Sequence, residues 1–149
     1  MNKRKIGLLV SLVIFGLSLY LLITGSSVLM LSLSDSSYIP LGTFTTWLGM
    51  IALPFLFYFT MKRLREPESK TDRVFALLLK ILIILAVLWI PISYLLAGNI
   101  SNTFSEKAVF QGGQLAMKMF WFNSYFTVAA PIVLAIVFGV YSLFRKRPK

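Results

Sequence analysis

Four long apolar runs divide this chain, and they constrain its fold more than any other feature. They cover about residues 6–25, 41–61, 74–97 and 117–144. Each run is close to or longer than the roughly 20 residues that an α-helix needs to cross the hydrocarbon core of a bilayer. We therefore predict an all-α integral membrane protein, a single domain over residues 1–149 with four transmembrane helices in a bundle.

Basic residues are grouped in the three segments that four crossings place on one side of the membrane. Three precede the first run, five lie between the second and third, and four follow the fourth, which accounts for twelve of the 15 lysines and arginines. Because short loops rich in lysine and arginine stay on the cytoplasmic side, both termini and the central loop are predicted to be cytoplasmic. The predicted location is the cytoplasmic (inner) membrane of a bacterium.

The composition agrees with this topology and excludes several kinds of chemistry. Hydrophobic residues make up 58% of the chain, which is too many for a soluble domain of 149 residues. The topology accounts for the formal net charge of +10, so this charge does not indicate a nucleic-acid partner. Because the chain has no cysteine and no histidine, it offers no disulfide, no usual zinc site and no histidine-ligated haem, and we expect no cofactor.

The acidic residues all fall outside the predicted spans. A proton-coupled carrier normally needs a carboxylate or a histidine inside the membrane, and none is present there. The sequence also lacks a nucleophile with its base, a pair of facing carboxylates and a metal-binding cluster. We therefore predict that the protein is not an enzyme.

Small residues recur along one face of the first run. Their spacings of four, seven and seven residues place them on one stripe of a helix: Gly7, Ser11, Ser18 and Gly25. In a membrane, small side chains let another helix come close, and dispersion forces then hold the pair together. We predict that this stripe packs against another helix.

Each of the other three runs contains a proline: Pro54, Pro91 and Pro131. A proline has no backbone N–H, and its ring clashes with the carbonyl four residues earlier, so it kinks a helix. These positions are candidate hinges, as in transporters built from broken helices. The alternative is that they have no role in motion, since prolines are commoner in membrane helices than in soluble ones.

Polar residues within the spans collect in the outer halves of the second and fourth runs. The second contains Thr45 and Thr46, and the fourth contains Asn123 and Thr127 at helical spacing. Such side chains either join helices by hydrogen bonds or form the polar lining of an outward-facing cavity. Lys80 lies about two turns inside the third run, where it either snorkels to the headgroups or faces the bundle and binds an anion.

Two loops are candidate contact surfaces. The central loop carries Lys62, Arg63 and Arg65, which can dock a cytoplasmic partner or anionic lipid headgroups. In the second outside loop, apolar residues recur at helical spacing from Ile100 to Leu115. This spacing predicts a short helix that lies at the outer membrane interface.

Two classes of function remain after these exclusions. The first is a small non-enzymatic membrane protein that acts through helix–helix and loop contacts, as a subunit of a membrane complex or as a membrane immunity or defence component. Its partners are then the lipid bilayer and another membrane protein or a second copy of the chain. The alternative is a homo-oligomeric channel or passive transporter, in which Lys80 and the polar groups of the second and fourth helices line the path.

Overall fold

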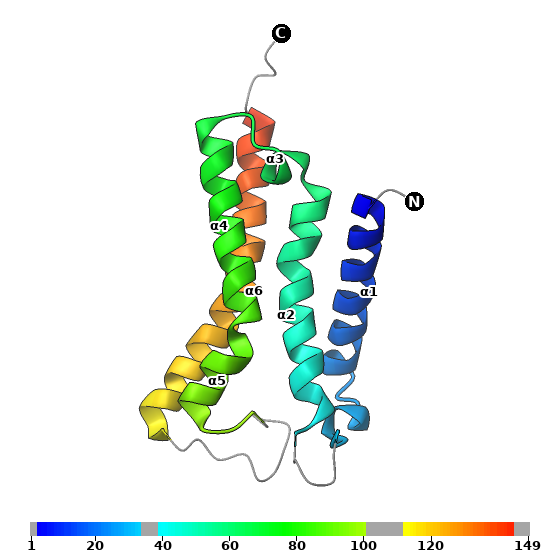
Figure 1. Ribbon diagram of the computed structural model, residues 1–149, viewed down its shortest axis with the longest axis vertical. Coiled ribbons are helices and arrows are strands. Elements are labelled where there is room, and N and C mark those ends of the chain that lie inside the picture. The colour runs from blue at the N-terminus through cyan, green and yellow to red at the C-terminus, as the bar shows by residue number, and fades with distance from the viewer. Residues whose placement is uncertain (1–2, 34–38, 101–111, 145–149) are drawn as a thin grey trace.

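The computed structural model of the chain describes residues 3–33, 39–100 and 112–144, and each regular element in these ranges is a helix (Figure 1). In chain order these elements are α1 (Lys3–Ile23), the 3₁₀ turn η1 (Ser27–Met30), α2 (Leu41–Thr60), α3 (Lys62–Arg65), α4 (Lys70–Val87), α5 (Trp89–Ala97) and α6 (Gly113–Phe144). The described part of the protein is therefore all-helical, as the sequence predicts.

Three helices, α1, α2 and α6, are long and apolar enough to cross a membrane. The pair α4 and α5 passes the same test only when taken together, and it is bent by 50° at the break between them. The prediction of membrane-spanning helices is confirmed to this extent: three spans, or four if the bent pair is one span. The third predicted run is thus not an uninterrupted helix, because it breaks at Leu88.

Helices α2, α4 and α6 form the centre of the structure, and α5 packs on α6 (Figure 1). The first helix packs on α2 and η1, and within the described residues it has no comparable contact with α4 or α6. The arrangement is therefore a three-helix centre with α1 added at one side. The physical reason is that α1 buries only Ser11 and Ser18, while its other faces carry exposed apolar side chains suited to lipid.

Two groups of buried side chains form the core of this centre. The first joins α3, α4 and α6 through Leu64, Leu79, Leu82, Leu134 and Phe138. The second contains Met50, Trp89 and Phe120, with Trp47 and Trp121 packed against them. All three tryptophans of the chain thus belong to this second group or pack against it.

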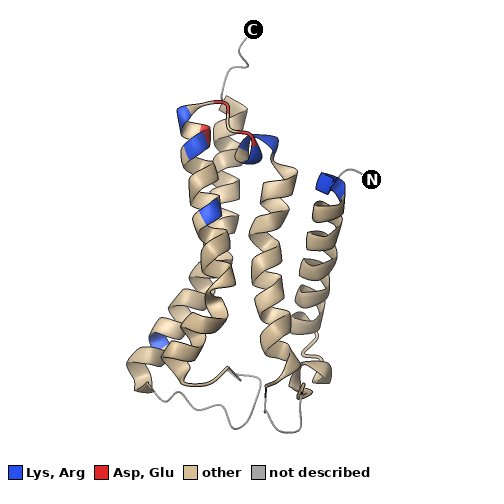
Figure 2. Cartoon of the chain, in the orientation of Figure 1, with Lys and Arg blue, Asp and Glu red and all other residues tan. Residues whose placement is uncertain are grey.

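Most charged residues gather at one end of the structure, which we call the charged end (Figure 2). This end holds α3, the beginning of α4, the beginning of α1 and the end of α6 (Figure 1). The described ends of the chain therefore lie at the same end as the central loop. This placement is the one that an even number of crossings requires.

Candidate functional site

Small residues and hydrogen bonds hold α1 against α2. Ser18 and Gly49 lie so close that a Cβ added to Gly49 would be 2.8 Å from the Cβ of Ser18. The Ser18 hydroxyl donates to the carbonyl of Thr45 at 3.0 Å. Gly7 lies against the ring of Phe59, where an added Cβ would come within 2.5 Å of a ring carbon. Three of the four predicted stripe residues, Gly7, Ser11 and Ser18, therefore lie in the α1–α2 contact.

Gly25 does not belong to this contact. Its φ is +59°, and no atom lies within 4 Å of the position that its Cβ would take. The backbone N–H of Ser26 donates to the carbonyl of Leu21 at 3.2 Å, and the backbone N–H of Gly25 donates to the carbonyl of Leu22 at 3.3 Å. This pair of bonds terminates a helix with a left-handed residue, which glycine adopts at little cost. Gly25 therefore ends α1, and the prediction that it packs against another helix is corrected.

A tryptophan of α2 bonds to the end of α4, beside the break between α4 and α5. Because Pro91 has no N–H, the carbonyl of Val87 loses the donor that a regular helix would give it. The indole Nε1–H of Trp47 donates to the carbonyls of Val87 and Ala86, both at 3.1 Å. A side chain from a neighbouring helix thus supplies the hydrogen bond that the proline removes.

The other two prolines lie inside continuous helices. Pro54 in α2 and Pro131 in α6 are almost fully buried, and neither helix is interrupted at its proline. Among the three candidate hinge positions, only Pro91 is associated with a break in the described helices. That break lies one turn before the proline, at Leu88, where the displaced carbonyls are.

Three hydroxyls in α2 and α6, those of Thr45, Ser124 and Thr127, are bonded within the protein. Thr45 donates to the carbonyl of Leu41 at 3.0 Å, and Thr127 donates to Asn123 at 2.7 Å, in each case four residues back in the same helix. The Ser124 hydroxyl accepts from the indole N–H of Trp89 at 2.9 Å and donates to the backbone carbonyl of Phe120. A hydroxyl bonded in this way needs no water, so it does not by itself mark an aqueous path.

Two polar groups of the predicted set are buried without a hydrogen-bond partner in the described part of the chain: the Thr46 hydroxyl and the amide nitrogen of Asn123. Asn123 lines a hollow of about 460 Å³ between α5 and α6. The other residues of this α5–α6 hollow are Ile92, Leu96, Lys118, Met119 and Phe122. The hollow therefore combines mostly apolar walls with one amide and one lysine.

Lys80 is exposed on α4 and does not face the interior of the bundle. Of the two orientations that the sequence leaves open, this position fits snorkelling, and a role of Lys80 in a path between copies of the chain stays a prediction. The long aliphatic stem can carry the ammonium group along the helix toward the headgroups.

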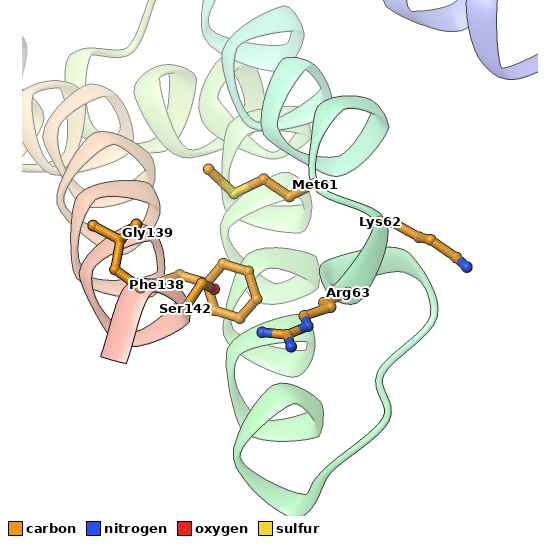
Figure 3. A pocket seen from close by; sticks show the side chains of 7 residues that line it. Met61, Lys62, Arg63, Phe138, Gly139 and Ser142 are labelled. Atoms are coloured by element: carbon orange, nitrogen blue, oxygen red, sulfur yellow. The ribbon is translucent and has the colours of Figure 1, made fainter. Parts of the chain in front are cut away.

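A larger hollow, of about 680 Å³, lies at the charged end between the α2–α3 segment and α6 (Figure 3). We call it the basic pocket; its lining residues are Met61, Lys62, Arg63, Phe138, Gly139, Ser142 and Leu143. Arg63 extends toward Phe138 and Ser142, whereas Lys62 points away from them (Figure 3). The side chains of Lys62 and Arg63, two of the predicted docking residues, thus point in different directions (Figure 3).

The ion pairs of the central loop explain this difference. The ammonium of Lys62 lies 3.9 Å from the Glu66 carboxylate, and the guanidinium of Arg65 lies 3.0 Å from the same carboxylate. Arg63 has no acidic partner among the described residues. Of the three predicted docking residues, Arg63 is therefore the one whose charge is available in the pocket.

Trp47, Trp89 and Gly49 were not among the predicted site residues. An indole N–H inside a membrane needs an acceptor, and a proline one helix away frees a carbonyl. These two requirements together could have predicted a hydrogen bond from an indole N–H to a carbonyl freed by a proline, such as the bond from Trp47 to Val87. Gly49 gives no comparable signal, because its role depends on which face of α2 receives α1.

Most of the predicted short helix of the second outside loop, Ile100 to Leu115, falls on residues 101–111, which are outside the described ranges, and its last residues belong to α6. The described residues include no group of three or more acidic, histidine or cysteine side chains that could hold a metal ion. Comparison with protein families, curated proteins and solved structures finds no match to this chain. The functional argument therefore rests on the geometry of the two hollows and of the helix contacts.

Proposed function

We propose that this protein is a small non-enzymatic membrane protein that binds another membrane protein through helix–helix contacts. It acts as a subunit of a membrane complex or as a membrane immunity or defence component. The observation that supports this proposal best is the α5–α6 hollow with Asn123 in its wall. Inside a bilayer, an asparagine side chain is stabilised by a hydrogen bond to another helix, and its amide nitrogen has no partner in the described residues.

The chemistry of the hollow indicates what kind of helix would fit it. Ile92, Leu96 and Met119 offer apolar contact area, and Phe122 beside them is 72% exposed. A partner helix with an apolar face would satisfy the packing, and one carbonyl or hydroxyl oxygen on it would bond Asn123 once the buried amide nitrogen turns into the hollow. Lys118 in the same wall favours an acidic group on the partner near the membrane surface.

The channel alternative draws less support from the same side chains. The hydroxyls of Thr45 and Thr127 are bonded to their own helices, and Lys80 is exposed on the outside of α4. A water-filled path needs polar groups that face a common space. We therefore favour a contact protein over a homo-oligomeric channel or passive transporter.

The proposed orientation follows from the charge distribution. We place the charged end in the cytoplasm and the protein in the inner membrane of a bacterium, because lysine and arginine are retained on the cytoplasmic side. The hollow is lined by α5 and the first part of α6, which lie at the opposite end from the charged end (Figure 1). Under this proposal the partner is bound in the outer half of the bilayer.

Affinity purification from native membranes in a mild detergent tests the proposal. The wild type should retain a stoichiometric membrane protein, and Asn123→Leu should retain it about 3- to 20-fold less well, which corresponds to the roughly 0.6–1.7 kcal/mol of a hydrogen bond between membrane helices. Gln114→Leu is the matched control, because it removes an exposed amide from the same helix outside the hollow. Full retention by Asn123→Leu, or a wild type purified alone, would contradict the proposal, and ion or solute flux in liposomes would favour the channel.

A further inference from the structure

The basic pocket lies at the level where the spanning helices end. Met61 follows the last residue of α2, and Ser142 is two residues from the end of α6. The ends of helices that cross a bilayer lie at the headgroups. A ligand in this pocket therefore meets lipid headgroups on one side and hydrocarbon on the other.

Two hydrogen-bond donors of the pocket come from opposite walls. The guanidinium of Arg63 extends from α3 toward α6, where Ser142 is located (Figure 3). The Ser142 hydroxyl is buried and has no hydrogen-bond partner among the described residues. A phosphate group accepts several hydrogen bonds at once, and the planar fork of an arginine binds it strongly.

The rest of the pocket is apolar and has room. Met61, Phe138 and Leu143 supply its hydrocarbon surface. Gly139 leaves space beside them, since a Cβ built there meets no atom within 4 Å. A volume of about 680 Å³ is far more than one phosphate group fills. The pocket therefore suits a ligand that joins a phosphate to a hydrocarbon chain.

We propose that the basic pocket binds an anionic phospholipid. Arg63 and Ser142 hold the headgroup phosphate, and the beginning of an acyl chain lies over Met61 and Phe138. The basic residues around the pocket repel the positive group of a zwitterionic headgroup, so an anionic headgroup is preferred. This inference is independent of the partner in the α5–α6 hollow, because the two hollows lie at opposite ends of the structure.

Native mass spectrometry of the full-length protein in detergent tests this assignment. The protein is titrated with phosphatidylglycerol or with phosphatidylcholine, and the bound lipid is counted. Arg63→Gln should weaken phosphatidylglycerol binding at least about fivefold, the equivalent of about 1 kcal/mol for one basic residue at an acidic surface. Gly139→Leu should weaken it similarly by filling the pocket, and it should leave the melting temperature unchanged or higher because the space is open.

The control variant is Arg73→Gln, which removes one positive charge from an exposed side chain at the same end. It should bind phosphatidylglycerol as the wild type does. An equal loss in Arg73→Gln would mean general attraction to basic loops and would overturn the proposal. Unchanged binding in both Arg63→Gln and Gly139→Leu would do so as well.

A competition experiment distinguishes a lipid ligand from a free anion. Inorganic phosphate at millimolar concentration should leave phosphatidylglycerol bound, because it has no hydrocarbon part to occupy the apolar walls. Displacement of the lipid by inorganic phosphate would identify a soluble-anion site and overturn the lipid assignment. Equal binding of phosphatidylcholine and phosphatidylglycerol would overturn the preference for an anionic headgroup.

Discussion

Replacing Gly49 by alanine tests the close contact between α1 and α2. The new Cβ would lie 2.8 Å from the Cβ of Ser18 and 3.1 Å from its hydroxyl oxygen. Non-bonded carbon atoms rest about 3.5–4.0 Å apart, so the two helices must separate by about 1 Å. The same movement stretches the 3.0 Å bond from Ser18 to Thr45 to about 4 Å, which is beyond hydrogen-bond range.

Three terms set the size of this effect. Overpacking of a tight contact costs about 1–3 kcal/mol. The lost hydrogen bond between membrane helices adds about 0.6–1.7 kcal/mol. Alanine offsets about 1 kcal/mol of this, because it is a better helix former than glycine. We expect Gly49→Ala to lower the free energy of unfolding by about 0.6–3.7 kcal/mol.

Unfolding in mixed micelles of a mild detergent and dodecyl sulfate measures this change. Gly16→Ala is the matched control on α1, because no atom lies within 4 Å of its added Cβ. The double variant Ser18→Gly with Gly49→Ala removes the opposing Cβ, so the cost of Gly49→Ala should be smaller in that background. If Gly49→Ala is as stable as Gly16→Ala, or if the two sites show no coupling, the reasoning about this contact is refuted.

Three further substitutions have expected outcomes in the same unfolding assay. Trp47→Phe should lower the free energy of unfolding by about 1–2 kcal/mol, since the carbonyl of Val87 is left without its donor; an unchanged value would mean that the indole bond contributes nothing. Gly25→Ala should cost about 1 kcal/mol because the residue keeps a φ of +59°, and Gly25→Asn should cost less. Lys80→Gln should change stability by less than about 0.5 kcal/mol and leave partner recovery unchanged, whereas a loss of partner would restore a role inside the bundle.

The positions of the helices follow from the sequence because a membrane span requires a long apolar run. The second run, residues 41–61, differs from α2 (Leu41–Thr60) by one residue. The break at Leu88 could not be placed in the same way, because Leu88 is as apolar as its neighbours. Pro91 indicated a disturbance in this helix, but the carbonyls that it displaces lie one turn earlier.

The mutual placement of the spans is the part that apolar runs do not encode. Hydropathy is the same for a helix surrounded by others and for one that lies at the side, since lipid and a bundle interior are both apolar. The small residues of α1 indicated one tight contact, which is the contact with α2. Nothing in the sequence pattern indicated that the other faces of α1 have no helix against them.

The candidate site was predictable for residues whose chemistry is local, and less so where a partner decides the role. The i, i+4 spacing of Asn123 and Thr127 lets the Thr127 hydroxyl donate to the backbone carbonyl of Asn123 at 2.7 Å. For Lys80, the sequence left two orientations open, and only the packing of α4 shows that it is exposed. Arg63 could not be separated from Lys62 by sequence, because the pairing with Glu66 depends on the short turn of α3.

The break between α4 and α5 bears on the choice between a moving and a static protein. A hinge needs a segment whose hydrogen bonds can open at little cost, and the inside of a bilayer offers no water to replace them. Here Trp47 bonds the carbonyls on the α4 side of the break, and Trp89 joins α5 to Ser124 of α6 at 2.9 Å. Rotation of α5 would have to break the bond of Trp89 to Ser124 of α6, while the bonds of Trp47 hold the end of α4 to α2. The bend therefore acts as a fixed part of the scaffold that shapes the α5–α6 hollow, which favours a contact surface over a gate.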